Sequence, residues 1–351
     1  MSALSLALTF AGSMLGAGYV SGQELYQYFQ CYGIKGMTGL VISLLFISVI
    51  MYLCVRIPGR TGSTAIDDLV IRWDNPELKK ILSVLVEAVY FPIGVVMTSG
   101  IVSLGEQLLG LPNYIGAAIA VILIYLCVYF GIDGMVRIFN SLVPILVAAA
   151  IIICCIRIGQ AGPERITFAE EDTNPLLGGW FFSSVNYACC NIFGMMGVLA
   201  AVSDRVKNAK TCFRGIILGG VFLFGVAMAI LCAMSVSGDC TAYDLPMLHL
   251  SQQMSQITGI VYGVLLFFAM FGNAVATFVA MINQYETRRK IRHKIPVLVI
   301  LAALTYLFSL YGFAKLVSVI FPFIGYVGIV TTLLIIEHAI HLFKEKRHEL
   351  F

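Results

Sequence analysis

The first hydrophobic segment of the chain carries glycines where a membrane helix would otherwise be continuous, in the run Gly16-Ala17-Gly18 followed by Gly22. Glycine weakens a helix interior, so we predict that the helix is interrupted here. Backbone N–H and C=O groups cannot stay unpaired in hydrocarbon, so protein, water or a ligand must supply their partners. A half-helix that starts at such a break presents free N–H groups and a partial positive charge, which suit an anion. The run therefore predicts a binding site at membrane depth.

A second hydrophobic segment, residues 180–202, has a similar composition. It contains the amides Asn186 and Asn191 and the glycines Gly194 and Gly197 inside an otherwise apolar run. We predict a second interruption in this segment. The alternative interpretation is that its glycines only allow neighbouring helices to pack closely, as small residues do in membrane bundles.

Two carboxylates lie inside predicted membrane segments, where ionisable groups are costly and often functional. Glu24 follows the first break by two turns, and Glu87 lies two turns into the third segment, near Tyr90. Either carboxylate could bind a proton or attract a cation along a transport pathway. The alternative is structural: Glu24 could lie in a wet outer vestibule, and Glu87 could pair with Arg137. The sequence leaves both interpretations open.

The composition indicates an all-α polytopic membrane protein. Of 351 residues, 60% are hydrophobic and 12% are charged, and the mean hydropathy is +0.93, values that soluble domains do not have. About 20 apolar residues span a bilayer as a helix. We predict ten transmembrane helices, at 5–29, 37–56, 81–105, 114–131, 137–157, 180–202, 213–236, 258–283, 296–312 and 316–341. They would form a single transmembrane domain over residues 1–351, ending in a short cytoplasmic tail, 342–351.

The distribution of basic residues predicts the orientation. Eighteen of the 22 Lys and Arg residues fall on one predicted side of the membrane, and only Lys35, Arg157, Arg165 and Lys315 fall on the other. Because basic residues concentrate on the cytoplasmic side, both termini should be cytoplasmic in a cell membrane. The net charge of +3 gives no indication of nucleic-acid binding.

An internal repeat appears when the chain is shifted by 178 residues. Several unusual residues then coincide, namely Gly16 with Gly194, Gly94 with Gly272, Ser99 with Thr277, Arg137 with Lys315 and Pro144 with Pro322. The shift pairs the first predicted helix with the sixth, so repeat one spans about 1–157 and repeat two about 180–341. Five helices per repeat reverse the second copy in the membrane. Such inverted repeats, with a broken helix in each half, are typical of secondary transporters.

These residues carry a resemblance to a known family. The Gly16-Ala17-Gly18 turn and the inverted repeat of five plus five helices resemble the amino acid–polyamine–organocation superfamily with its LeuT-like fold, in which helices one and six are discontinuous. The run from Gly16 to Glu24 is most similar to YkvI-type bacterial membrane proteins. The resemblance in fold covers nearly the whole chain, whereas the glycine motif is short.

The resemblance implies a set of site residues. The backbone N–H groups of Gly16, Ala17 and Gly18 would receive a substrate carboxylate. A sodium ion would lie between the carbonyls of Gly12 and Leu15 and the side chains of Asn273 and Thr277 in helix eight. Phe278 follows Thr277, whereas sodium-coupled relatives have two adjacent hydroxyl residues there. Helix five has no interior Lys of the kind found in proton-coupled relatives, which favours sodium over protons.

Selectivity for the substrate would come from Tyr90, Met97, Asn191 and Phe193, beside Gly194 in helix six. No Arg or Asp lies inside helices six or eight, so a small neutral or apolar amino-acid-like solute is the simplest substrate.

The function predicted from the sequence is therefore secondary active transport, coupled to a cation, by alternating access. The chain has no motif of an intramembrane protease, an α/β-hydrolase or a phosphate-binding loop, and we expect it not to be an enzyme. Sodium as the coupling ion is the only cofactor expected, and the expected partners are a solute and the lipid bilayer. The alternative is a channel or a membrane sensor with the same fold. The sequence does not determine the oligomeric state.

Overall fold

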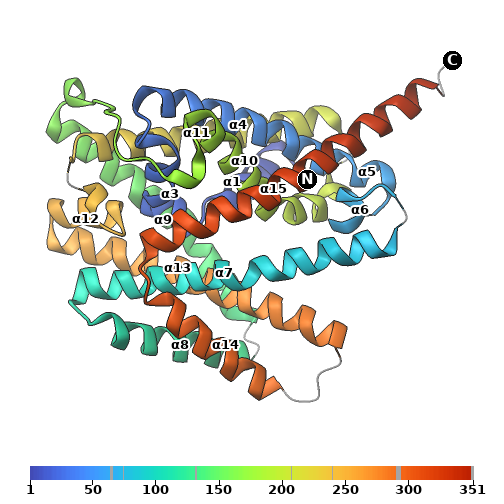
Figure 1. Ribbon diagram of the computed structural model, residues 1–351. Helices are drawn as coiled ribbons and strands as arrows, with labels where there is room; N and C mark the ends of the chain where they lie inside the picture. The colour runs from blue at the N-terminus through green and yellow to red at the C-terminus, as the bar shows by residue number, and fades with distance from the viewer. Residues whose placement is uncertain are drawn as a thin grey trace.

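The protein is described here by a computed structural model in which almost every ordered segment is helical (Figure 1). The structure describes the backbone of residues 1–63, 66–73, 75–130, 133–206, 208–238, 240–289 and 294–348. It describes the side chains of all of these except residues 60, 87, 133–142, 283–289, 294 and 343–348.

The longer helices run roughly side by side along one direction of the molecule (Figure 1). They are α4 (Gly33–Arg56), α7 (Pro76–Leu109), α8 (Asn113–Phe130), α9 (Asp133–Ala161), α10 (Trp180–Ala201), α11 (Ala209–Ser235), α13 (Gln256–Arg289), α14 (Lys294–Ser309) and α15 (Phe313–His348). The shorter helices are α1 (Ala3–Met14), α2 (Ala17–Ser21), α3 (Gln23–Leu25), α5 (Pro58–Thr61), α6 (Ile66–Val70) and α12 (Pro246–Met254). A π-helix, η1 (Tyr26–Gln30), follows α3, and four short 3₁₀ helices lie in the connections, η2 (Pro163–Arg165), η3 (Pro175–Leu177), η4 (Ser203–Arg205) and η5 (Cys240–Ala242).

The helices confirm a multi-pass membrane protein. Among the described residues, eight helices are long and apolar enough to cross a bilayer, and two shorter apolar helices cover 3–14 and 295–309. Apolar side chains cover much of the outer surface, as lipid contact requires. The exact number of ten membrane crossings stays a prediction.

The predicted interruption of the first helix is confirmed. Helix α1 ends at Met14, and the extended ψ of 174° at Gly16 separates it from α2. The Gly16 N–H donates to Met14 O at 2.7 Å, so the Gly12 carbonyl loses the donor that a continuous helix would supply. Gly22, with a φ of 85°, then ends α2 in the left-handed region, which glycine adopts without steric cost.

The prediction of a break in helix six is wrong. Helix α10 is one continuous α-helix from Trp180 to Ala201. Its glycines provide space instead. An added Cβ at Gly197 would lie 2.8 Å from Ile66 Cδ1, whereas Gly194 has open space beside it. A continuous helix pairs its own backbone groups, so it needs no partner to be stable in lipid.

The helix boundaries agree with the internal repeat. Helices α4, α7, α8 and α9 begin 176, 180, 181 and 180 residues before α11, α13, α14 and α15, respectively. The packing also corresponds when the halves are exchanged. Helix α1 packs against α11 as α10 packs against α4, and α7 packs against α15 as α13 packs against α9. These observations support the repeat, and its inversion stays a prediction.

Helices α10 and α15 pack so closely that the backbone of α15 contacts the backbone of α10. A Cβ added at Gly328 of α15 would overlap the backbone oxygen of Cys189 in α10, and one at Gly325 would overlap the Asn186 amide. The side chain of Asn186 bridges the two helices, because its Nδ2 donates to Pro322 O at 3.0 Å.

We expect Gly328→Ala to destabilise the protein by about 1–3 kcal/mol, because α15 must move away from α10 to admit the methyl group. Gly225→Ala in α11 is the matched control, since an added Cβ there meets nothing within 4 Å. Thermal unfolding of both variants in the same detergent tests this. Equal melting temperatures would show that α10 and α15 do not pack this closely.

Candidate substrate and cation site

Two adjoining cavities lie beside the interruption between α1 and α2. The smaller has a volume of about 180 Å³ and the larger about 670 Å³. Both are lined by Ser13 of α1, Ile93 of α7, and Phe193 and Gly194 of α10. The smaller cavity could hold about six waters at ~30 Å³ each, which is room for a small solute. The cavities are therefore the candidate site.

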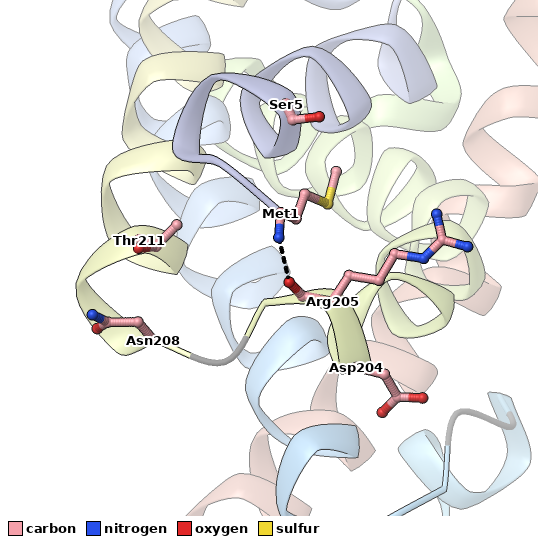
Figure 2. Close-up of a pocket in the computed structure, with 6 residues that line it drawn as sticks. All are labelled: Met1, Ser5, Asp204, Arg205, Asn208 and Thr211. Carbon is pink, nitrogen blue, oxygen red and sulfur yellow. Dashed lines mark hydrogen bonds between the residues drawn. The ribbon is translucent and has the colours of Figure 1, made fainter.

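The groove shown in Figure 2 is a weaker candidate. It has a volume of about 660 Å³ and lies where Met1 meets the connection between α10 and α11. The Met1 amine donates to Arg205 O at 2.7 Å, while the side chains of Asp204 and Arg205 point away from that nitrogen (Figure 2). Its polar side chains do not converge, so the groove does not form a site.

Glu24 is the charged residue of the smaller cavity. Its side chain is only 8% exposed, although it lines the cavity. The turn at Gly22 brings it back over α2, where a Cβ added at Gly18 would overlap its Oε1 atom. Within the described part of the chain, no basic group lies within 4.0 Å of this carboxylate. A buried charge without a partner is costly, so this carboxyl group either binds a proton or is balanced by a cation in the cavity.

Tyr187 and Asn191, one turn apart on α10, add two polar groups to the same cavity. Tyr187 is 1% exposed, and its hydroxyl finds no hydrogen-bond partner in the protein. Its ring is fixed against Phe29, with ring centroids 4.8 Å apart. Asn191 Nδ2 donates to Tyr187 O at 3.0 Å, which leaves Asn191 Oδ1 as an acceptor.

The structure gathers many of the predicted residues around the cavities. Those that line one or both are Glu24, Tyr90, Met97, Asn191, Phe193, Gly194, Asn273 and Thr277. Five predicted residues belong to neither lining, namely Gly12, Leu15, Gly16, Ala17 and Gly18. The side chains of Glu87 and Arg137 lie outside the described residues, so their pairing stays untested.

Sequence reasoning missed Ser13 and Tyr187. Ser13 lies three residues before the predicted break at Gly16, and nothing in its local sequence distinguishes it. Tyr187 lies four and seven residues before Asn191 and Gly194, a spacing that puts all three on one face of a helix. This spacing could have identified Tyr187 as a neighbour of the predicted site residues Asn191 and Gly194.

Helix α13, which carries the predicted sodium ligands Asn273 and Thr277, lies beside the break between α1 and α2. An added Cβ on Gly16 would lie 4.0 Å from Asn273 Nδ2, so α13 meets the break directly. Thr277 Oγ1 donates to Asn273 O at 2.7 Å, and its lone pairs remain free to bind a cation. The Gly12 carbonyl has lost its helical donor. These oxygens are hard ligands of the type that sodium binds.

Hydrogen bonds close the bundle on the side of α3 and η1. The segment after α9 pairs with the start of α4, where Glu171 N donates to Cys31 O at 2.9 Å and Lys35 Nζ lies 2.8 Å from Glu170 Oε1. Pro322 has no N–H to offer the Ser318 carbonyl in α15, and Asn174 Nδ2 donates to that carbonyl at 2.7 Å.

On the opposite side, the larger cavity extends toward α6, whose Ile66 lines it together with Val86 and Val198. Helix α6 is fixed to the bundle by polar contacts. Lys79 Nζ lies 2.7 Å from Asp68 Oδ1, and this hydrogen bond lowers the pKa of the Asp68 carboxyl below its usual value. His338 Nδ1 lies 3.0 Å from Leu69 O. The larger cavity thus reaches toward α6, and the hydrogen bonds beside η1 join neighbouring segments at the other end of the bundle.

Comparison with known proteins identifies the fold. The chain is 23% identical over 333 residues to the uncharacterized membrane protein YkvI of Bacillus subtilis, covering 93% of both chains. It superposes on the inward-facing conformation of Mhp1, a nucleobase-cation-symport-1 family transporter, with a TM-score of 0.56 and 13% identity over 95% of this chain and 75% of that one. A mutant of the Eremococcus coleocola manganese transporter gives a TM-score of 0.54 and 16% identity over 87% and 69%.

The chain has a LeuT-like fold. The structural neighbours share this fold, and their sequence identities of 16% and 13% support a conclusion about the fold alone. No protein-family model matches the chain. The fold prediction is therefore confirmed at the level of architecture, whereas the family stays at the level of resemblance.

We expect Gly18→Ala to destabilise the protein by about 1 kcal/mol, because the new methyl group must displace the buried end of the flexible Glu24 side chain. Gly16→Ala should change stability by less than ~0.5 kcal/mol, since its φ of −82° suits any residue and Asn273 Nδ2 lies 4.0 Å from the added Cβ. Thermal unfolding of both variants measures the difference. If Gly18→Ala were as stable as Gly16→Ala, Glu24 would not lie against Gly18.

Proposed function

We propose that the protein is a secondary active transporter of a small amino-acid-like solute, coupled to a cation, sodium rather than a proton, and working by alternating access. The observation that carries this proposal is the cavity beside the α1–α2 interruption, where Glu24, Tyr187 and Asn191 converge inside a bundle of apolar helices. Intramembrane polar groups that line a cavity mark substrate and ion pathways.

The asymmetry of the two ends supports alternating access. The contacts of Lys35, Glu171 and Asn174 join segments of the bundle at the end near η1, while the larger cavity extends toward α6. With the basic residues assigned to the cytoplasmic side, we propose that the larger cavity extends toward the cytoplasm. Ten crossings in two inverted halves, with cytoplasmic termini in a cell membrane, are part of this proposal.

Sodium coupling is supported by the oxygen ligands near the break, namely the Gly12 carbonyl, Asn273 and Thr277. A divalent metal, which the manganese transporter carries, has less support. Among the described residues, no group of three His, Cys, Asp or Glu side chains could hold a metal ion.

Uptake into liposomes tests the transport function. The purified protein should accumulate at least one radiolabelled solute, from a panel of amino acids and related amines, above the equilibrium level when a sodium gradient is imposed. Empty liposomes and a collapsed gradient are the controls. Equilibration without accumulation would indicate a channel, and absence of uptake under both sodium and proton gradients would indicate a sensor.

Replacement of Thr277 tests the coupling ion. Thr277→Ala should raise the sodium concentration for half-maximal uptake about tenfold, because it removes one oxygen ligand from the cation. Thr331→Ala is the matched control, since Thr331 Oγ1 makes the same type of bond to its own helix, to Gly328 O at 3.0 Å, away from the cavities. An unchanged sodium response in Thr277→Ala would exclude this site.

A further inference from the structure

The position of Glu24 bears on the class of substrate. In the predicted site, the N–H groups of Gly16, Ala17 and Gly18 receive a carboxylate from the substrate. In the structure, the Gly16 N–H donates to Met14 O, and the carboxylate of Glu24 already lies against Gly18 in the first turn of α2. The protein thus supplies its own anion at the start of this half-helix.

The polar atoms that remain for a ligand are mainly acceptors. Asn191 Oδ1 and the ionised form of the Glu24 carboxylate can only accept hydrogen bonds from a ligand, and the unpaired Tyr187 hydroxyl can accept or donate. No Lys, Arg or His lines either cavity among the described residues. A second carboxylate brought in by the substrate would meet the charge of Glu24 without a described cation to balance it.

A protonated amine fits this set of groups. An ammonium group has three N–H donors and a positive charge, which match two acceptors, a hydroxyl and a buried carboxylate. The aromatic side chains Phe193 and Phe321 line the same cavity, and aromatic rings favour organic cations over hydrated inorganic ones. The volume of about 180 Å³ limits the ligand to a small molecule.

We infer that the smaller cavity binds the protonated amine of a small organic substrate through Glu24, Asn191 and Tyr187, and that the substrate needs no carboxylate. The inference rests on the proposed transport function, because it takes this cavity as the substrate site. The inference narrows the proposed substrate class to small solutes that the protein recognises by their amino group.

Equilibrium binding with a matched set of ligands tests the inference. Isoamylamine, leucine and 4-methylpentanoate share one branched apolar chain, and they carry respectively an amine, an amine with a carboxylate, and a carboxylate alone. In detergent at neutral pH, isoamylamine should raise the apparent melting temperature of the full-length protein by about 2–4 °C. Leucine should give a smaller rise, and 4-methylpentanoate none.

Substitution of Glu24 tests the assignment to this carboxylate. Glu24→Gln should weaken isoamylamine binding at least about 30-fold, because the amine loses its buried counter-charge. Glu106→Gln is the matched control, since Glu106 is exposed on α7 and lines neither cavity. Tyr187→Phe removes only the hydroxyl and should weaken binding by a smaller factor of about 3–10.

Two results would overturn the inference. One is stabilisation by leucine or 4-methylpentanoate that exceeds that by isoamylamine. The other is stabilisation by sodium chloride alone that depends on Glu24, without any effect of the amine. The assay needs no vesicles, so Glu24-dependent amine binding without uptake would contradict transport while supporting the site. Uptake without preference for amines would contradict only the substrate class.

Discussion

A polypeptide backbone in hydrocarbon must have its polar groups paired. Between Met14 and Ala17 the regular helical pairing of these groups is interrupted. Helix α1 stops there, Gly16 turns its N–H to Met14 O, and the Gly12 carbonyl loses its helical donor. The surrounding structure compensates. Tyr262 Oη donates to Val20 O at 2.6 Å, and Tyr19 Oη donates to Leu223 O at 2.8 Å, so α2 is fixed between α11 and α13. Hydrogen bonds from neighbouring helices therefore hold the interrupted segment in place.

The rest of the site depends on this interruption. Because α2 is short and ends at Gly22, the chain turns back and places Glu24 over Gly18. The continuous helix α10 passes opposite and contributes Tyr187, Asn191 and the open space at Gly194. One broken helix and one continuous helix thus enclose a small polar volume, and α7 and α15 complete its apolar walls. The polar groups are held by rigid helices, which preorganises them for a ligand.

The asymmetry between the two halves is notable because their helices otherwise correspond. The packing of α1 on α11 repeats in α10 on α4, yet only α1 is interrupted. Three glycines within seven residues, at 16, 18 and 22, combine an extended residue with a left-handed one. The glycines of α10 stay helical, with Gly197 packed against Ile66 and Gly194 beside the cavities. Glycine permits a break, but local contacts decide whether it occurs.

The sequence by itself determined the class of fold, the first break and several of the polar residues that line the cavities. Hydropathy fixes which segments lie in lipid, and the 178-residue offset pairs the helices. Tyr90 and Asn191 stood out as polar residues inside apolar segments, and the resemblance to the LeuT-like fold implied Asn273 and Thr277. Only the tertiary structure decided that α10 is continuous, that Glu24 lies against Gly18, and that Tyr187 has an unpaired hydroxyl. These facts depend on a left-handed turn at Gly22 and on contacts between helices far apart in the chain. Composition and periodicity describe each helix separately, and they carry no information about which face of one helix meets another.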